Sequence, residues 1–122
     1  MINLDQTQQR ILGVLLEKQR TVPDTYPMTE KSLITGCNQS SNRDPVMSLR
    51  SFEVAGALMS LHGSDIVLRI EGSSRAVKYR HKLDEILGIG ESQLVVLAEL
   101  LLRGPQAPGA LKPRVARLGL DA

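Results

Sequence analysis

Lysine and arginine residues gather in one short stretch of this chain, and the chemistry that they suggest is phosphate binding. Residues 69–82 hold five of them against a single acid, Glu71. Such cations neutralise the phosphates of duplex DNA and give salt-sensitive binding with little sequence preference. They could instead lie at strand edges to prevent edge-to-edge aggregation. With two cations from earlier in the chain, the candidate nucleic-acid-binding residues are Arg43, Arg50, Arg69, Arg75, Lys78, Arg80 and Lys82.

A second cluster of polar groups lies between residues 37 and 48, where amides and hydroxyls surround one opposite-charge pair. These side chains could converge on a ligand. They could also satisfy backbone donors and acceptors in a long irregular connection, as Asn, Asp and Ser often do. We favour the second interpretation. The candidate polar site consists of Asn38, Gln39, Asn42 and Asp44.

Reactive groups elsewhere do not combine into a catalytic or metal-binding pattern. Cys37 lies on the apolar side of an expected helix, so we interpret it as a small buried hydrophobe rather than a nucleophile. His62 and His81 show no ligand spacing with each other or with Cys37. The glycines of residues 88–90 follow no expected strand and precede no Lys-Ser or Lys-Thr pair. We therefore expect no enzymatic activity, no metal site and no cofactor.

Two helices are expected in the first part of the chain. Apolar residues recur at helical spacing over residues 4–19, and Asp5 is placed as an N-cap or first-turn acid. Val22 precedes Pro23, which disfavours a helical backbone there. Thr29 supplies the N-cap hydroxyl of a second helix, which should stop near residue 37 or 38.

A third helix is expected after the polar connection. Within that connection, Asp44-Pro45 is typical of an N-cap followed by proline at the first helical position, which predicts a single turn through Met47. Ser51 is expected to cap the third helix, roughly residues 52–62. Its expected apolar side consists of Val54, Leu58 and Leu61.

A β-hairpin should follow the third helix. Residues 66–70 alternate in polarity, residues 71–74 form a turn, and residues 75–80 form the return strand. The side chains expected to point toward the core are Ile66, Leu68, Ile70, Val77 and Tyr79. Those expected to point away from it are Val67, Arg69, Ala76, Lys78 and Arg80. The hairpin therefore presents one apolar face and one basic face.

The order helix, helix, polar connection, helix, hairpin is that of a winged-helix domain. The expected fold class is therefore mostly α with a small β-hairpin (α+β), a winged helix-turn-helix over residues 1–82. Residues 83–90 are expected to form a linker with a short helical start. Residues 91–122 repeat the opening helix-loop-helix plan, with helices at about 91–103 and 108–118, and are interpreted as an incomplete second winged-helix domain.

This second helical pair should not stand alone. A pair this short cannot bury its apolar surface by itself. It must pack on the first domain, pair with another copy of the chain, or belong to a longer parent chain. Pro113 lies inside its second helix and would remove one backbone hydrogen bond there.

Composition narrows the class of protein. The chain has 122 residues, of which 42% are hydrophobic and 23% charged, as in soluble globular proteins. We expect no membrane span and no signal peptide, and the single cysteine fits a reducing cytoplasm. The net charge of +2 is weak, so the distribution of cations carries the nucleic-acid hypothesis. Only three aromatic residues are present, too few for gripping single strands by base stacking.

Several segments resemble one family closely. They are Leu15-Leu16-Glu17-Lys18-Gln19, Tyr26-Pro27, Cys37-Asn38-Gln39, residues 41–49 (SNRDPVMSL), Lys78-Tyr79-Arg80-His81 and residues 97–106 (LAELLLRGPQ). Together they resemble the YceH-like family of bacterial proteins of unknown function. The resemblance implies two winged-helix domains in tandem and supplies no catalytic residues. The chain departs from the family pattern at Gly90, where a capping Ser or Thr is more usual, and at Pro113.

These observations lead to two hypotheses of different kinds. The first is a cytoplasmic protein that binds double-stranded DNA, in a role in transcription regulation, with the hairpin holding the DNA backbone. The expected third helix carries no bidentate base reader, so we expect it to complete the core rather than read a sequence. The second is a protein-interaction or dimerisation module without nucleic-acid binding. It would form a homo-oligomer or take a protein partner through the C-terminal helices, and the apolar, charge-poor third helix is a further docking surface.

Overall fold

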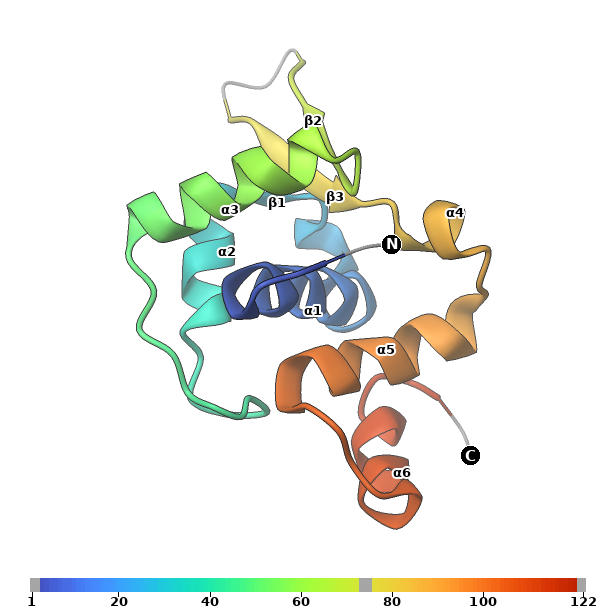
Figure 1. Cartoon of the computed structure of the whole chain (residues 1–122). Helices are drawn as coiled ribbons and strands as arrows, with labels where there is room; N and C mark the ends of the chain where they lie inside the picture. Colours follow the sequence, from blue (N-terminus) through green and yellow to red (C-terminus); the bar gives the residue numbers. More distant parts are fainter. Residues whose placement is uncertain (1–2, 73–75, 121–122) are drawn as a thin grey trace.

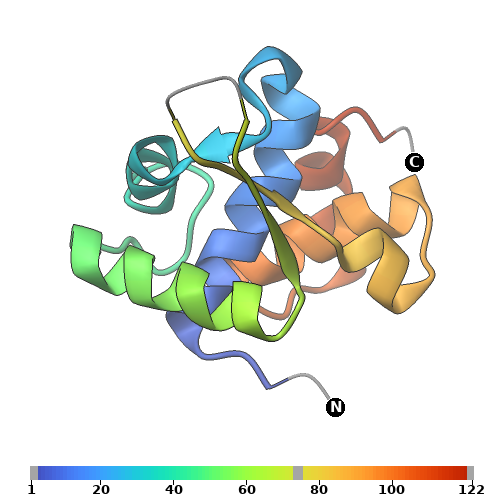
Figure 2. The same ribbon diagram turned by 90° about the horizontal axis from the view of Figure 1, so that it is seen from above.

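Helix α1 (Gln6–Thr21) lies at the centre of the molecule, and the other elements surround it (Figures 1 and 2). The structure is a computed structural model that describes residues 3–72 and 76–120. Asp5 caps α1 as expected: its carboxylate accepts from the backbone N–H of Gln8, and the Gln8 side chain accepts from the backbone N–H of Asp5. This reciprocal capping fixes the start of the helix two residues later than the apolar spacing predicts.

Two short elements separate α1 from the second helix. The 3₁₀ turn η1 (Pro23–Thr25) is followed by strand β1 (Met28–Thr29) and then by α2 (Glu30–Cys37). Thr29 caps α2 as expected, because its hydroxyl accepts from the backbone N–H of Ser32 at 3.1 Å. The sequence reasoning missed β1, which is only two residues long.

Helix α3 (Ser51–Gly63) follows the connection, and its expected apolar side is buried. Arg50 is its N-cap residue, and the backbone N–H of Arg50 donates to Glu53 at 3.0 Å. The prediction that Ser51 is the cap is therefore wrong by one residue. The expected turn at Asp44-Pro45 is also wrong, because residues 39–50 contain no helical turn. The backbone of this connection bonds to a distant segment of the chain instead: the N–H of Asp44 donates to the carbonyl of Leu102 at 3.0 Å.

The hairpin consists of β2 (Val67–Ile70) and β3 (Lys78–His81). Both neighbours of β3 are antiparallel to it, in the sheet order β1-β3-β2. A mostly helical α+β fold with a small antiparallel sheet is therefore confirmed. The order of elements through β3 is winged-helix-like.

The remaining elements are helical. They are α4 (Leu83–Leu87), α5 (Glu91–Arg103) and α6 (Pro108–Ala116). Helix α5 packs on α1 and runs along it, α4 contacts α5, and α6 packs against α5 on the side away from the hairpin (Figures 1 and 2). The helix predicted at residues 91–103 is confirmed residue for residue. Pro113 is accommodated within α6, which ends two residues before the predicted Leu118.

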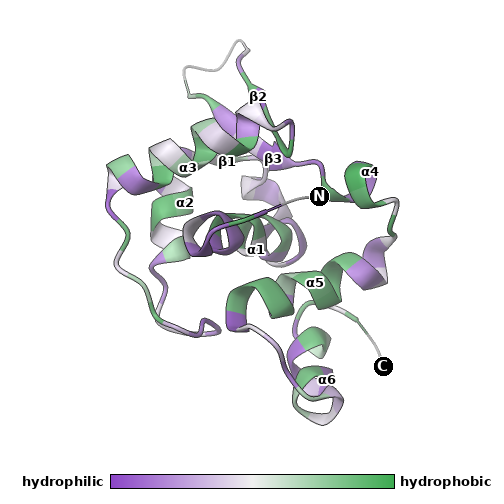
Figure 3. Cartoon of the chain, in the orientation of Figure 1, coloured by the Kyte–Doolittle hydropathy of each residue, from purple (hydrophilic) through white to green (hydrophobic). Residues whose placement is uncertain are grey.

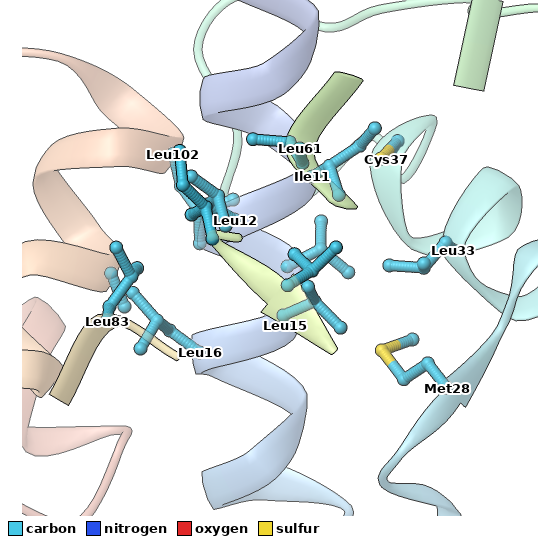
Figure 4. Packing of buried hydrophobic residues seen from close by; sticks show 14 of the residues in the cluster. Ile11, Leu12, Leu15, Leu16, Met28, Leu33, Cys37, Leu61, Leu83 and Leu102 are labelled. Carbon is cyan, nitrogen blue, oxygen red and sulfur yellow. The ribbon is translucent and has the colours of Figure 1, made fainter. Parts of the chain in front are cut away.

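One hydrophobic core joins these layers (Figure 4). Helix α1 contributes side chains to the core on two sides: Leu15 is fully buried toward α2, and Leu12 is fully buried toward α5. Leu102 of α5 and Leu33 of α2 are equally inaccessible to solvent. Figure 3 shows α5 as hydrophobic along much of its length, which is consistent with its burial against α1. Within the described part of the chain, no helix has the length and apolar character to cross a membrane.

Candidate nucleic-acid interface

The outer face of the hairpin is defined by the register of its two strands. Leu68 lies opposite Arg80, and Ile70 lies opposite Lys78. Directly opposed residues of an antiparallel pair point to the same side of the sheet. The other side carries Val67 and His81, which are 0% and 3% exposed. Lys78 and Arg80 therefore point away from the core, and they share the outer face with Leu68 and Ile70.

This register corrects one sequence prediction. Val67 and Arg69 were expected on the outer face, and Leu68 and Ile70 on the core face. In the structure Val67 is fully buried and Arg69 lies on the same side of the sheet as Val67, whereas Leu68 and Ile70 are half-buried on the outer face. Ile66 is buried as expected, yet it precedes the strand. Asp65 has a positive φ of 61°, and the backbone N–H of Ile66 donates to Leu61 at 2.9 Å. The chain thus turns between α3 and β2, and the alternation begins at Val67.

Acidic neighbours occupy most of the cations on the hairpin. Arg69 pairs with Glu71 at 2.5 Å, Lys82 with Asp65 at 2.9 Å, and Arg80 with Glu85 at 3.6 Å. In each of these pairs at least one of the two side chains is exposed to solvent, so the pair contributes little to stability. A phosphate could therefore replace the carboxylate. In the described ranges, Lys78 and Arg50 have no ion-pair partner. Arg75 lies outside the described residues.

Helix α3 presents a nearly uncharged surface beside the hairpin. Phe52 is 68% exposed and Met59 is 76% exposed, with exposed Gly56 between them. From Ser51 to Gly63 the helix contains no Arg, Lys, Asn or Gln, the side chains that pair with base edges. The opposite side of α3 completes the core, as the sequence predicted.

Arg43 is not on the surface. Its guanidinium is buried and makes a forked contact with the carboxylate of Glu17, at 2.9 Å and 2.6 Å, while its Nε donates to the carbonyl of Gly36 at 3.0 Å. Planar forks of this kind are strong and geometrically specific. Burial opposes ionisation of Glu17, but the hydrogen bonds and charge of Arg43 outweigh it and hold the pKa of Glu17 below its usual value. Arg43 therefore cannot reach a phosphate in this structure.

The four residues of the candidate polar site do not converge on a common cavity. The amide of Asn38 both donates to and accepts from the backbone of Leu49, at 2.9 Å and 2.7 Å. Gln39 accepts from Lys18 at 3.1 Å, and Asn42 accepts from Arg103 at 3.3 Å. The carboxylate of Asp44 is exposed. Three of the four side chains thus hold the connection in place, which supports the interpretation that we favoured.

An ionic network missed by the sequence reasoning extends from Arg43 into the C-terminal helices. Arg117 bridges the carboxylates of Glu17 and Glu99, at 2.9 Å and 2.6 Å. Glu99 is fully buried, and Arg103 lies 3.8 Å from it. An acid inside the otherwise apolar stretch of residues 94–102 was the available signal. This network joins the polar connection to α1, α5 and the end of α6.

Cys37 is buried, as the sequence predicted. Burial is the main cause that raises the pKa of its thiol to about 12, although Arg10 and Arg43 oppose that shift. A thiol of this kind is almost entirely protonated at neutral pH and is a poor nucleophile. Within the described ranges, His, Cys, Asp and Glu side chains form no group of three that could hold a metal ion.

Comparison with known proteins places this architecture in one group. The family model described as "Protein of unknown function, DUF480" matches residues 4–120. A UPF0502 protein of Geobacter sulfurreducens, GSU0233, is 46% identical over 117 residues, which cover 96% of this chain and 53% of that protein. A UPF0502 protein of Pseudoalteromonas atlantica is 42% identical over 122 residues, with 97% and 53% covered. This chain spans about half the length of the curated relatives that it matches.

Proposed function

The chain belongs to the DUF480 family of uncharacterised bacterial proteins, as its YceH-like segments indicated, and on that premise we propose that it binds duplex DNA through the phosphate backbone. The observation that carries the proposal is the position of Lys78 and Arg80 on the outer face of the hairpin. A role in transcription regulation, in the cytoplasm, is the setting in which such binding would act.

The contacts expected on DNA are few. Lys78 has no acidic partner in the described part of the chain, and Arg80 lies 3.6 Å from Glu85 and donates to the carbonyl of His81 at 3.3 Å. Arg50, exposed at the start of α3, is a third candidate, while Arg69 and Lys82 would first have to leave their closer acids. Arg43 is no longer a candidate because it is buried against Glu17. Two or three phosphate contacts give weak, strongly salt-dependent binding.

Sequence preference is expected to be low. Base readout requires donors and acceptors that reach the groove, and the exposed side of α3 offers chiefly Phe52, Gly56 and Met59. Phosphate contacts set the position of a protein on the duplex and carry no sequence information of their own. The proposed activity is therefore backbone binding, with any specificity supplied by a longer protein or a partner.

Fluorescence anisotropy with a labelled duplex at low salt tests the proposal. We expect the variant Lys78→Ala/Arg80→Ala to lose at least about tenfold in affinity, since each lost phosphate contact removes favourable counterion release. The matched control is Lys112→Ala/Arg114→Ala, which removes the same charge from α6, on the far side of the molecule (Figure 1). Equal affinity of the two double variants, or no detectable binding by the unmodified protein, would overturn the proposal.

A further inference from the structure

The exposed side of α3 carries two large apolar side chains with two small residues between them. Phe52 and Met59 are 68% and 76% exposed, and Ala55 and Gly56 lie midway between them on the same side of the helix. A Cβ atom added at Gly56 would meet nothing within 4 Å, so the helix surface is open at this point. The nearest acid on the helix, Glu53, is occupied by the backbone N–H of Arg50.

A pocket of about 310 Å³ lies beside Met59, between α3 and the hairpin. Helix α3 supplies its residues at positions i, i+3, i+4 and i+7, which are Ala55, Leu58, Met59 and His62. Four residues with this spacing form the hole into which a side chain of a facing helix inserts as a knob. Glu30, Arg69 and Tyr79 complete the wall of the pocket. The pocket therefore has the shape of a helix-docking hole with a mostly apolar floor.

Knob and hole lie on the same helix, which is the condition for a self-complementary two-fold interface. When two copies of one helix cross antiparallel, each residue on one side of the crossing point meets a residue equally far on the other side. Positions 52 and 59 are symmetric about the point between Ala55 and Gly56. Small residues at a crossing let the two helix axes approach closely. Phe52 of each copy would then lie over the hole of the other.

We propose that two copies of this chain associate through α3, with Phe52 of each seated in the Ala55–Leu58–Met59–His62 pocket of the partner subunit. A second copy is favoured over other occupants because this face supplies both halves of the contact. An acidic or basic peptide would find no row of opposite charges on it. The charged residues at the rim of the pocket, Glu30 and Arg69, are of opposite sign, so the two-fold arrangement need not bring like charges together. The proposal does not rest on DNA binding.

Charge reversal across the predicted contact is the principal test. A contact built mainly on one helix is small, so we expect a dissociation constant on the order of micromolar, measured by sedimentation equilibrium. Phe52→Glu and Met59→Lys should each weaken association at least tenfold. The double variant Phe52→Glu/Met59→Lys should recover at least tenfold relative to Phe52→Glu, since residue 52 of one copy then faces an opposite charge at residue 59 of the other. Both side chains are solvent-exposed in the single chain, and circular dichroism checks that each variant is folded.

Two outcomes would overturn the proposal. One is an unmodified protein that stays monomeric up to about 500 μM, far above the expected dissociation constant. The other is a double variant that is as monomeric as the single variants. The predicted register requires the two opposite charges to restore association, whereas nonspecific hydrophobic association does not. Ile86→Glu is the matched control, since Ile86 is 41% exposed on α4, away from α3, and its replacement should leave association unchanged.

Cross-linking tests the crossing point separately. Cys37 is the single cysteine and is buried, so any disulfide that forms between two copies comes from the introduced cysteine. Gly56→Cys should form a disulfide-linked dimer under mild oxidation, because each residue 56 lies next to the two-fold axis. Gly63→Cys is the control: it is equally open, but its two copies would be separated by about 20 Å along the helices. Equal cross-linking at the two positions would contradict the register.

Discussion

At the scale of the residue, the arginine that the sequence offered as a surface cation proves to be an internal support. Arg43 and Glu17 are 26 positions apart and are 5% and 1% exposed, and their fork is continued by Arg117 and Glu99. Local reasoning could place Arg43 in a polar connection. It could not show that the connection folds back over the middle of α1, because that contact depends on tertiary packing.

Removal of Glu17 should be costly. A buried ion pair that loses one partner leaves an uncompensated charge, which typically destabilises a protein by about 3 to 5 kcal/mol. We therefore expect Glu17→Gln to lower the free energy of unfolding, measured by urea titration, by about that amount. The matched control is Glu71→Gln, which breaks a surface pair with Arg69 and should leave the midpoint nearly unchanged. Similar midpoints for the two variants would show that the Arg43 fork is not a structural support.

His81 should make stability depend on pH. Burial lowers the pKa of its imidazole, although Asp84 opposes that shift, and its Nδ1 accepts from the backbone N–H of Leu83 at 3.1 Å. A folded-state pKa below the unfolded value of about 6.5 means that the unfolded chain binds the proton first. The stability that neutral His81 contributes to the folded state is thus fully present above about pH 6.5. It is lost as the pH falls from about 6.5 toward the lower pKa of the folded state.

Urea titrations between pH 8 and pH 5 measure this effect. For the unmodified protein, we expect the urea concentration at the midpoint to decrease as the pH is lowered below about 6.5. For His81→Gln, we expect a smaller decrease. A pH profile that His81→Gln leaves unchanged would assign the dependence to another group.

At the scale of the element, sequence reasoning was most accurate where a helix boundary depends on adjacent residues. The caps at Asp5 and Thr29 and the limits of α5 are all local features, and all three are confirmed. The errors arose where distant segments decide. Strand β1 exists because Met28 and Thr29 pair with β3 some fifty residues later, and the Asp44 backbone is held by Leu102 rather than by a helical turn.

Glycines on the helices should respond to alanine in opposite directions. A Cβ at Gly13 would lie 2.9 Å from two atoms of fully buried Leu102, where α1 meets α5. A Cβ at Gly109 of α6 would meet nothing within 4 Å. Gly13→Ala should therefore lower the free energy of unfolding despite the better helix propensity of alanine, while Gly109→Ala should raise it by up to about 1 kcal/mol. Calorimetry that shows both variants stabilised would disprove the close contact between α1 and α5.

At the scale of the whole molecule, α5 and α6 are part of the same packed body as the hairpin-bearing elements. The sequence left three possibilities for this helical pair, and the structure shows it packed on α1 and joined through Glu17, Glu99 and Arg117. The division of the chain at residues 82 and 90 stays a prediction. Helix α5 has its apolar surface against α1, so the face left open for a second copy is that of α3. The sequence had offered both the apolar third helix and the C-terminal helices as surfaces for association.

The two proposals are compatible on this body. Association through α3 covers a surface without base readers, and it leaves the outer face of the hairpin, with Lys78 and Arg80, on the other side of the strands. A dimer would present two such faces. Two linked weak sites bind a long duplex more tightly than one site does, provided that both can engage it at once.

The most direct measurement is the salt dependence of duplex binding by the unmodified protein and by Lys78→Ala/Arg80→Ala. If these two side chains each neutralise one phosphate, the slope of log K against log salt should become shallower by about 2 in the variant for each hairpin that contacts the duplex. The same slope for both proteins would mean that the outer face of the hairpin does not touch DNA, and the proposed function would be wrong.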